Sequence, residues 1–216
     1  MTPQPDRDTA REFVKQFHES NVWKTIRYRG IRTLKYPMDL WNYQEIIHER
    51  GIDWVIETGT RHGGSALFFA DQLRLRGSRG NVITIDPFPE LEYDLAAHPN
   101  IGQVRGDSGS AQLAEAIHSR LPPGRGPLFL ILDADHSRNH VLRELNAHVP
   151  HLRPGDYLVV EDTIVNGHPV RPDHGPGPRE ALGEFLAAHP DLLTADEPRN
   201  RRFGFSMADE GYFIRN

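Results

Sequence analysis

The stretch WVIETGTRHGGS, residues 54–65, decides the fold. It begins with a short apolar run, which predicts a buried strand, and passes through a glycine turn into a helical pattern. In a parallel sheet such a turn lies at the carboxyl end of its strand, where α/β folds bind their ligands. Gly59 is followed by Gly63 and Gly64, so the dinucleotide pattern G-x-G-x-x-G is absent and hydride transfer is disfavoured. The turn either holds an anionic group, such as the carboxylate of an amino acid, at the helix N-terminus or only packs helix against strand.

Short apolar runs alternate with helical stretches along the rest of the chain. This alternation predicts an α/β fold in which helices cover both faces of a mostly parallel sheet. The expected strands are residues 54–57, 81–85, 103–105, 128–132 and 157–160, and the expected helices are residues 65–76, 110–119, 137–149 and 179–189. Upstream, a capping box at Thr9 predicts one helix, and Asp39 is expected to cap a second over residues 40–50. Residues 203–207 and 212–215 predict a C-terminal antiparallel hairpin.

Composition narrows the class of protein. The 216 residues include 25 Lys and Arg, 30 Asp and Glu and no Cys, which gives a formal net charge of −5. The length suits a single domain, in which residues 1–50 form a helical segment, a candidate substrate cover or oligomer contact, ahead of a main domain over residues 51–216. Without Cys there is no disulfide, thiolate metal site or thiol nucleophile. The mild negative charge argues against a nucleic-acid partner, and neither a membrane-spanning run nor a secretory signal is expected. We therefore expect a cytoplasmic homo-oligomer that acts on a small molecule.

Polar residues lie at the ends of the first three expected strands. Glu57 ends the first of them. Asp86 ends the second strand, where a carboxylate can accept both hydroxyls of a ribose. Asp107 and Ser108 follow the third strand, at the position of an adenine edge. The alternative is that Asp86 is a turn residue before Pro87 and that Asp107 caps a helix. Acidic groups at three strand ends favour an adenosyl ligand.

A second acidic cluster follows the fourth and fifth expected strands, and it consists of Asp133, Asp135, Glu161 and Asp162. Neighbouring parallel strands lie about 4.8 Å apart, so these carboxylates should meet at one rim of the sheet. They would repel one another there unless a cation neutralised them. Oxygen ligands without Cys favour Mg²⁺. The alternative is that Asp133 caps the next helix while Glu161 and Asp162 pair with Arg residues.

Four blocks of sequence resemble the cephalosporin hydroxylase and rhamnosyl O-methyltransferase family. They are LKYPMDLWNYQEII (34–47), IETGTRHGGSA (56–66), LDADHSRNHVLREL (132–145) and the segment from YLVVEDTIVNGHPV (157–170) through GPGP (175–178). The resemblance extends over most of the chain after about residue 20. It implies a Rossmann-like class I methyltransferase fold, to which a C-terminal hairpin belongs, and an S-adenosylmethionine- and Mg²⁺-dependent O-methyltransferase.

The resemblance also implies a ligand set for each cofactor. The residues implied for S-adenosylmethionine are Glu57, Gly59, Gly63, Gly64, Ser65, Asp86 and Ser108, and we place Asp107 and Asp133 on the same cofactor side. The residues implied for Mg²⁺ are Asp135, Glu161 and Asp162, with Asp133 as the alternative to Asp135.

Methyl transfer to a hydroxyl needs a base close to the metal. Related catechol-type enzymes place a lysine three residues after the metal Asp; here that position is His136 counted from Asp133, or Arg138 counted from Asp135. Arg stays protonated at any useful pH, so His136 is the candidate base, with Asp135 beside it and His168 second. For each His a purely structural role is the alternative.

Two other functions compete with this interpretation. An iron(II) hydroxylase would need an H-x-D pair and a later His, and the pair His189-Pro190-Asp191 has no His after it. A non-catalytic S-adenosylmethionine-binding accessory protein is the other alternative, although an intact acidic cluster argues against it.

The acceptor is expected to be a hydroxyl of a sugar or of a natural product such as an antibiotic. Residues 166–178 contain Gly or Pro at seven of thirteen positions, which favours a lid. Aromatic and polar residues of the N-terminal segment and of this loop are candidates for the acceptor pocket: Trp23, Tyr28, Tyr36, Trp41, His168, Arg171 and His174.

Overall fold

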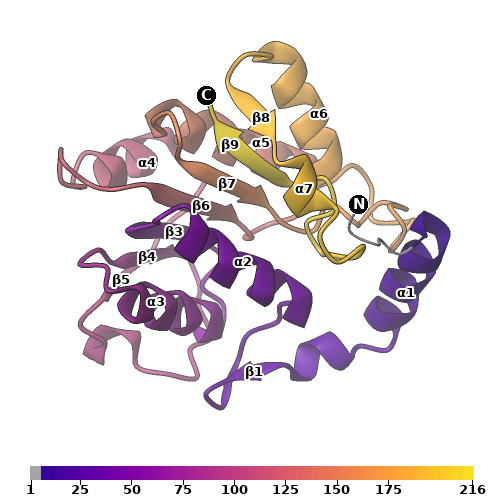
Figure 1. Ribbon diagram of the computed structural model, residues 1–216, viewed down its shortest axis with the longest axis horizontal. Coiled ribbons are helices and arrows are strands. Elements are labelled where there is room, and N and C mark those ends of the chain that lie inside the picture. Colours follow the sequence, from indigo (N-terminus) through magenta and orange to yellow (C-terminus); the bar gives the residue numbers. More distant parts are fainter. Residues whose placement is uncertain (1–5) are drawn as a thin grey trace.

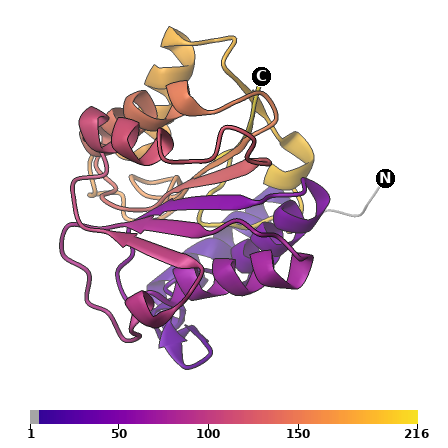
Figure 2. The ribbon, with the colours of Figure 1, turned by 90° about the vertical axis from the view of Figure 1, so that its left-hand side faces the viewer.

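The structure is a computed structural model that describes residues 6–216, so the part of the expected N-terminal segment that precedes residue 6 lies outside it. One seven-stranded sheet forms the middle of the molecule, and helices pack on both of its faces (Figures 1 and 2). The strands of this sheet are β3 (Trp54–Thr58), β4 (Val82–Ile85), β5 (Ile101–Val104), β6 (Leu128–Leu132), β7 (Tyr157–Val160), β8 (Leu193–Ala195) and β9 (Tyr212–Arg215). The helices are α1 (Arg7–Glu19), α2 (Pro37–Glu49), α3 (Gly64–Arg76), α4 (Ala111–His118), α5 (Arg138–His148), α6 (Pro178–Ala188) and α7 (Glu197–Asn200). Two short strands of two residues each, β1 (Arg27–Tyr28) and β2 (Ile31–Arg32), form a separate hairpin outside this sheet.

The order of strands across the sheet is β5-β4-β3-β6-β7-β9-β8. The pairs from β5 to β7 are parallel, whereas β9 pairs antiparallel with both β7 and β8. The chain reverses its direction of winding between β3 and β6, which is the topological switch point at which open α/β sheets bind ligands. The predicted fold class is therefore confirmed, and the sheet directs the carboxyl ends of β3 and β6 toward one site.

The alternating side chains of β6 show how the layers are held together. Phe129 and Ile131 face the hydrophobic cluster formed with α2 and α3, while Leu128, Leu130 and Leu132 face the cluster formed with α4, α5 and α6. All five are at most 2% exposed. Burial of each large apolar side chain contributes about 1.5–3 kcal/mol, so both faces of the strand stabilise the sandwich.

Two predicted helix starts are wrong. The first helix begins at Arg7 rather than after Thr9, because the side chain of Asp6 caps it and accepts a hydrogen bond from the backbone N–H of Thr9. The second begins at Pro37, so Asp39 lies inside α2 and is not its cap. The Asp39 carboxylate is buried, and it accepts hydrogen bonds from Met207 N at 2.9 Å and Tyr212 Oη at 2.8 Å.

The expected C-terminal hairpin is half right. Residues 212–215 form β9, but its antiparallel partner at this edge is Leu193–Ala195, which α7 separates from it in the chain, and not residues 203–207. The latter form turns, because Ser206 and Met207 bond to Asp39 instead of to a neighbouring strand. Phe205 and Met207 pack in one hydrophobic cluster with Val14 of α1. The alternating apolar pattern that suggested a strand therefore reflects packing against a helix.

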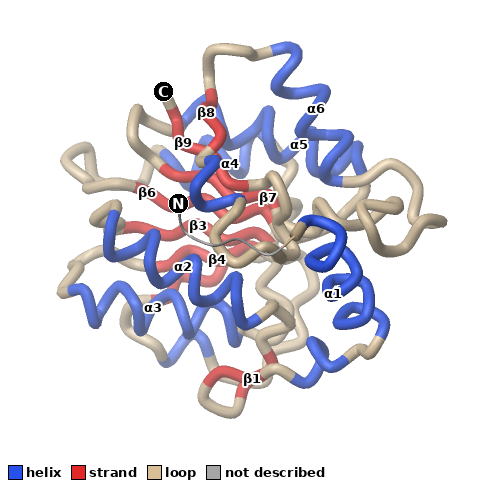
Figure 3. Tube along the Cα trace, turned by 45° about the vertical axis from the view of Figure 1, so that its right-hand side comes forward, coloured by secondary structure: helices blue, strands red, loops and turns tan. Residues whose placement is uncertain are grey.

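The N-terminal segment is packed against the loops at the carboxyl ends of the strands. α1 lies to one side of the sheet (Figure 3), and its Val14 packs with Ile164, Val170 and Met207 in a third hydrophobic cluster. Within residues 6–216, none of the helices combines the length and the apolar character needed to cross a bilayer.

Candidate active site

The carboxyl ends of five parallel strands surround one cavity of about 1060 Å³. Each strand is followed by a residue that lines it, namely Gly59, Asp86, Asp107, Asp133 and Asp162. The volume is at the upper end of the range of about 300–1,000 Å³ found for ligand sites, which leaves room for more than one small molecule. The sequence predicted this convergence, because it predicted the strand ends.

The turn after β3 leaves no room for side chains. A Cβ built at Gly59 would lie 1.9 Å from the carbonyl oxygen of Asp133, and one at Gly64 would lie 2.3 Å from the carbonyl oxygen of Arg32. Gly63 precedes α3 with φ of +86°, in the left-handed region that favours glycine. Ser65 near the start of α3 lines the cavity, whereas Gly63 and Gly64 do not, so the helix meets the cavity at its N-terminal end, where an anionic group is favoured.

Glu57 lies beneath this turn and is fully buried. Its Oε2 accepts a hydrogen bond from Thr84 Oγ1 at 3.0 Å, whereas Oε1 has no hydrogen-bond partner among the described residues. Burial raises the pKa of Glu57 to about 7, and the Lys35 ammonium opposes that rise. Glu57 does not itself line the cavity, so it contributes a negative group beneath the glycine turn rather than a part of the cavity wall.

The residues predicted for the adenosyl end also line the cavity. Asp86 accepts hydrogen bonds from Arg61 N at 2.9 Å and from Phe88 N at 2.8 Å, so it shapes its own turn as well. Asp107 pairs with Arg143 at 2.7 Å, and this hydrogen bond lowers the pKa of Asp107. Ser108 is buried, and its Oγ lies 3.1 Å from His140 Nε2.

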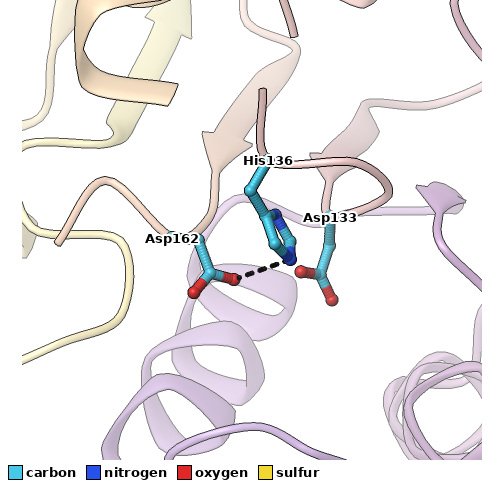
Figure 4. Close-up of side chains that lie close together, drawn as sticks. All are labelled: Asp133, His136 and Asp162. Carbon is cyan, nitrogen blue, oxygen red and sulfur yellow. Dashed lines mark ion pairs between the residues drawn. The ribbon is translucent and has the colours of Figure 1, made fainter. Parts of the chain in front are cut away.

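A possible metal site lies in the same cavity. Asp133, His136 and Asp162 each offer a ligand atom, all within 4.8 Å of one another, and they are the only such group among residues 6–216 (Figure 4). His136 Nε2 lies 3.5 Å from Asp162 Oδ2. Asp162 holds φ of +54°, an unfavourable backbone conformation for a residue with a side chain, and such strain clusters at functional sites. The carboxylate and imidazole ligands suit a divalent cation.

The other two predicted metal ligands have different surroundings. Asp135 lines the cavity but is exposed, and its Oδ1 accepts a hydrogen bond from Ser137 N at 2.8 Å. Glu161 is 1% exposed, and its Oε1 accepts from Tyr43 Oη at 2.8 Å and lies 2.7 Å from Lys35 Nζ. Asp135 therefore supports the start of α5, and Glu161 lies behind Asp133 and Asp162.

Lys35 is a site residue that sequence reasoning missed. Its ammonium lies 2.5 Å from Asp133 Oδ2 and is almost completely buried. Burial would lower the pKa of Lys35, but Asp133 and Glu161 outweigh it and raise the pKa, which favours the ammonium form. Only its presence in the family-like block 34–47 could have drawn attention to it.

The two candidate bases lie in different places. His136 is in the metal-binding group; burial would lower its pKa, but Asp162 and Asp133 raise it. His168 lies outside the cavity wall and places its Nε2 2.8 Å from Glu180 Oε1. Glu180 also accepts from Asn166 and from Gly177 N, so it ties both ends of the expected lid to α6.

Few of the residues predicted for the acceptor reach the cavity. Trp23 and Arg171 line it, together with His18 and Lys24, which were not predicted. The His18 and Trp23 rings are stacked with centroids 5.5 Å apart. The remaining five do not line it: Tyr28 bonds to Asp71, Tyr36 is buried, Trp41 is 58% exposed on α2, His168 bonds to Glu180, and His174 bonds to Gly175.

The residues of the alternative iron site lie elsewhere. His189 follows the last residue of α6 and packs against Phe185 with the two rings tilted by 49°, and neither it nor Asp191 lines the cavity. The hydroxylase interpretation therefore gains no support from the geometry.

Comparison with known proteins shows which family the chain resembles. The family described as rhamnosyl O-methyltransferase/CmcI matches residues 20–216. A rhamnosyl O-methyltransferase of Mycobacterium tuberculosis (strain ATCC 25618 / H37Rv) is 41% identical over 213 residues, which cover 98% of this chain and 87% of the relative. One from Mycobacterium leprae (strain TN) is 40% identical over 216 residues, covering 100% of this chain and 94% of the relative.

Solved structures share the fold. The structure "cmcI-D160 Mg-SAM" superposes with a TM-score of 0.69 at 25% identity, over 89% of this chain and 77% of that one. The MycE methyltransferase from the mycinamycin biosynthetic pathway, in complex with Mg, SAH and mycinamycin VI, has a TM-score of 0.55 at 21% identity, over 70% of this chain and 44% of that one. The family predicted from the four sequence blocks is thus confirmed, and the chain belongs to the rhamnosyl O-methyltransferase/CmcI family.

Proposed function

We propose that this chain, an S-adenosylmethionine-dependent O-methyltransferase, methylates a hydroxyl of a sugar or of a glycosylated natural product with the help of a divalent cation, Mg²⁺. The observation that carries the proposal is that the glycine turn and the Asp133, His136 and Asp162 group open into the same cavity. The relatives named rhamnosyl O-methyltransferases support a sugar acceptor, and the CmcI structure with Mg and SAM supports the two cofactors.

The roles of the residues follow from their places in the cavity. When bound, S-adenosylmethionine would supply the methyl group and Mg²⁺ would lower the pKa of the acceptor hydroxyl. The turn at Gly59 and the start of α3 would bind the methionine end, and Asp86 would bind the ribose. Asp133 and Asp162 would hold the cation. The family resemblance instead predicts Asp135, Glu161 and Asp162 as the metal ligands. Mutation of each residue would distinguish this ligand set from the pair Asp133 and Asp162.

His136 is our proposed base rather than a third ligand of the cation, because its ring lies beside both metal carboxylates. In the metal-free protein those carboxylates raise the pKa of His136, and a bound cation would oppose that rise. We therefore expect turnover to rise with pH until His136 has lost its proton.

The N-terminal segment is our proposed acceptor wall. His18 and Trp23 offer a flat aromatic surface, on which the apolar face of a sugar ring can pack. This agrees with the expected substrate cover over residues 1–50. The expected homo-oligomer stays a prediction, which light scattering would test.

Calorimetry with S-adenosylmethionine, with and without Mg²⁺, tests the proposal directly. We expect cofactor binding in both conditions and a mass gain of one methyl group on a rhamnoside only when Mg²⁺ is present. Asp162→Asn should abolish the transfer and leave cofactor affinity nearly unchanged. Asp173→Asn is the matched control, because Asp173 is exposed and lies outside the cavity wall. Folded protein that binds no S-adenosylmethionine would refute the proposal.

A further inference from the structure

Lys35 connects two strand ends of the acidic rim. Its Nζ lies 2.5 Å from Asp133 Oδ2, after β6, and 2.7 Å from Glu161 Oε1, after β7. The Lys35 and Glu161 side chains are each 1% exposed. A buried ion pair with this geometry fixes the side chains that form it, because neither can rotate without leaving a charge unpaired.

Tyr43 completes the arrangement from α2. Its hydroxyl donates a hydrogen bond of 2.8 Å to Glu161 Oε1, the same oxygen that Lys35 approaches. Among residues 6–216, no hydrogen bond reaches Glu161 Oε2 or Asp133 Oδ1. Each carboxylate is thus held by one oxygen, and for Asp133, which lines the cavity, the other oxygen is left for a ligand.

We propose that Lys35, itself held by Glu161 and Tyr43, is a positioning residue of the metal site, and that it fixes Asp133 so that the free oxygen of this carboxylate serves a divalent cation. The inference rests on the proposed function. Groups that bond to metal ligands fix their orientation, and their loss typically weakens metal affinity about 10–100-fold. Lys35 is unusual in this role because it comes from the segment before α2 and not from the sheet.

The positive charge of Lys35 by itself opposes metal binding. An ammonium beside Asp133 repels a divalent cation, so a neutral residue at this position would strengthen metal binding if repulsion decided the outcome. The positioning proposal therefore predicts a sign: removing the ammonium weakens metal binding.

The test measures Mn²⁺ binding to protein without S-adenosylmethionine or acceptor, by electron paramagnetic resonance. We expect Lys35→Met, of similar length but unable to donate, to bind Mn²⁺ about 10–100-fold more weakly and with a changed spectrum. Lys35→Arg should recover part of the affinity. Tyr43→Phe keeps the ring that packs in the core and loses only the hydroxyl, so it tests the same proposal if Lys35→Met does not fold. We expect Tyr43→Phe to weaken Mn²⁺ binding about tenfold.

Arg125→Met is the matched control. Arg125 and Asp156 form another buried ion pair, with side chains 2% and 3% exposed, and neither residue lines the cavity. Its removal should destabilise the protein and leave Mn²⁺ affinity unchanged.

Each outcome decides the proposal. If Lys35→Met and Tyr43→Phe bind Mn²⁺ as tightly as the unaltered chain, or more tightly, the positioning role is refuted while the metal site stands. If the unaltered chain binds no Mn²⁺, the metal part of the proposed function fails and the role of Lys35 fails with it.

Discussion

Gly59→Ala offers a stringent test of the geometry at the switch point. Gly59 has φ of +84°, and a Cβ there would lie 1.9 Å from the carbonyl oxygen of Asp133. The left-handed conformation costs about 1–2 kcal/mol for a residue with a side chain. The clash is with backbone, so the end of β6 must move, and forced overpacking costs about 1–3 kcal/mol more. We therefore expect Gly59→Ala to lower the free energy of unfolding by about 2–5 kcal/mol.

The chain provides the control for this experiment. Gly77 has φ of +82°, but no heavy atom lies within 4 Å of the position that a Cβ would take there, so Gly77→Ala should lose only the conformational part, about 1–2 kcal/mol. Urea unfolding measures both losses, and calorimetry with S-adenosylhomocysteine measures binding, which we expect to be lost in Gly59→Ala and kept in Gly77→Ala. Equal losses of stability in the two variants would show that the approach of Gly59 to Asp133 is not tight.

Three further predictions concern other parts of the cavity. Asp133→Asn should weaken Mg²⁺-dependent turnover at least 100-fold with little change in cofactor affinity; normal turnover would remove Asp133 from the metal site. For Glu57, burial raises the pKa from 4.5 to about 7, so the folded state binds the proton more tightly than the unfolded chain. The stability gained is complete below the unfolded pKa and is lost as pH rises to about 7. Between pH 5 and 7.5 the free energy of unfolding should therefore fall by about 2 kcal/mol less in Glu57→Gln than in the unaltered chain, and an equal fall in both would contradict this. Trp23→Ala should raise the KM for a rhamnoside about tenfold and leave the affinity for S-adenosylmethionine unchanged, whereas an unaltered KM would exclude Trp23 from the acceptor wall.

The middle of the sheet was predictable because β6 and β7 are buried along their whole length, whereas the partly exposed edge strand β8 was not predicted. β6 and β7 have the predicted bounds, since each is an apolar run between loop residues that no helix pattern crosses. The C-terminal segment was not predictable in the same way. Phe205 and Met207 alternate as strand residues do, but they pack with α1, and the Met207 N–H bonds to Asp39, 168 positions away. A periodic pattern cannot show such a long-range partner.

The candidate site likewise contains residues that the sequence predicted and residues that it could not predict. Gly59, Asp86 and Asp162 were found because each follows a strand, and the ends of parallel strands must meet. Lys35 and His18 precede the sheet in the chain and enter the site only through tertiary packing. Sequence spacing carries no information about that packing.

The N-terminal segment is for this reason a part of the catalytic domain and not only a cover. α2 provides Tyr43, Ile46 and Ile47 to the core on one face of the sheet, all at most 1% exposed. The residues just before it provide Lys35 to the acidic rim, and α1 packs on the loop after β7. A chain cut at residue 50 would expose that face of the sheet and leave Asp133 and Glu161 without the Lys35 ammonium, so we expect loss of the segment to affect both folding and the proposed metal site.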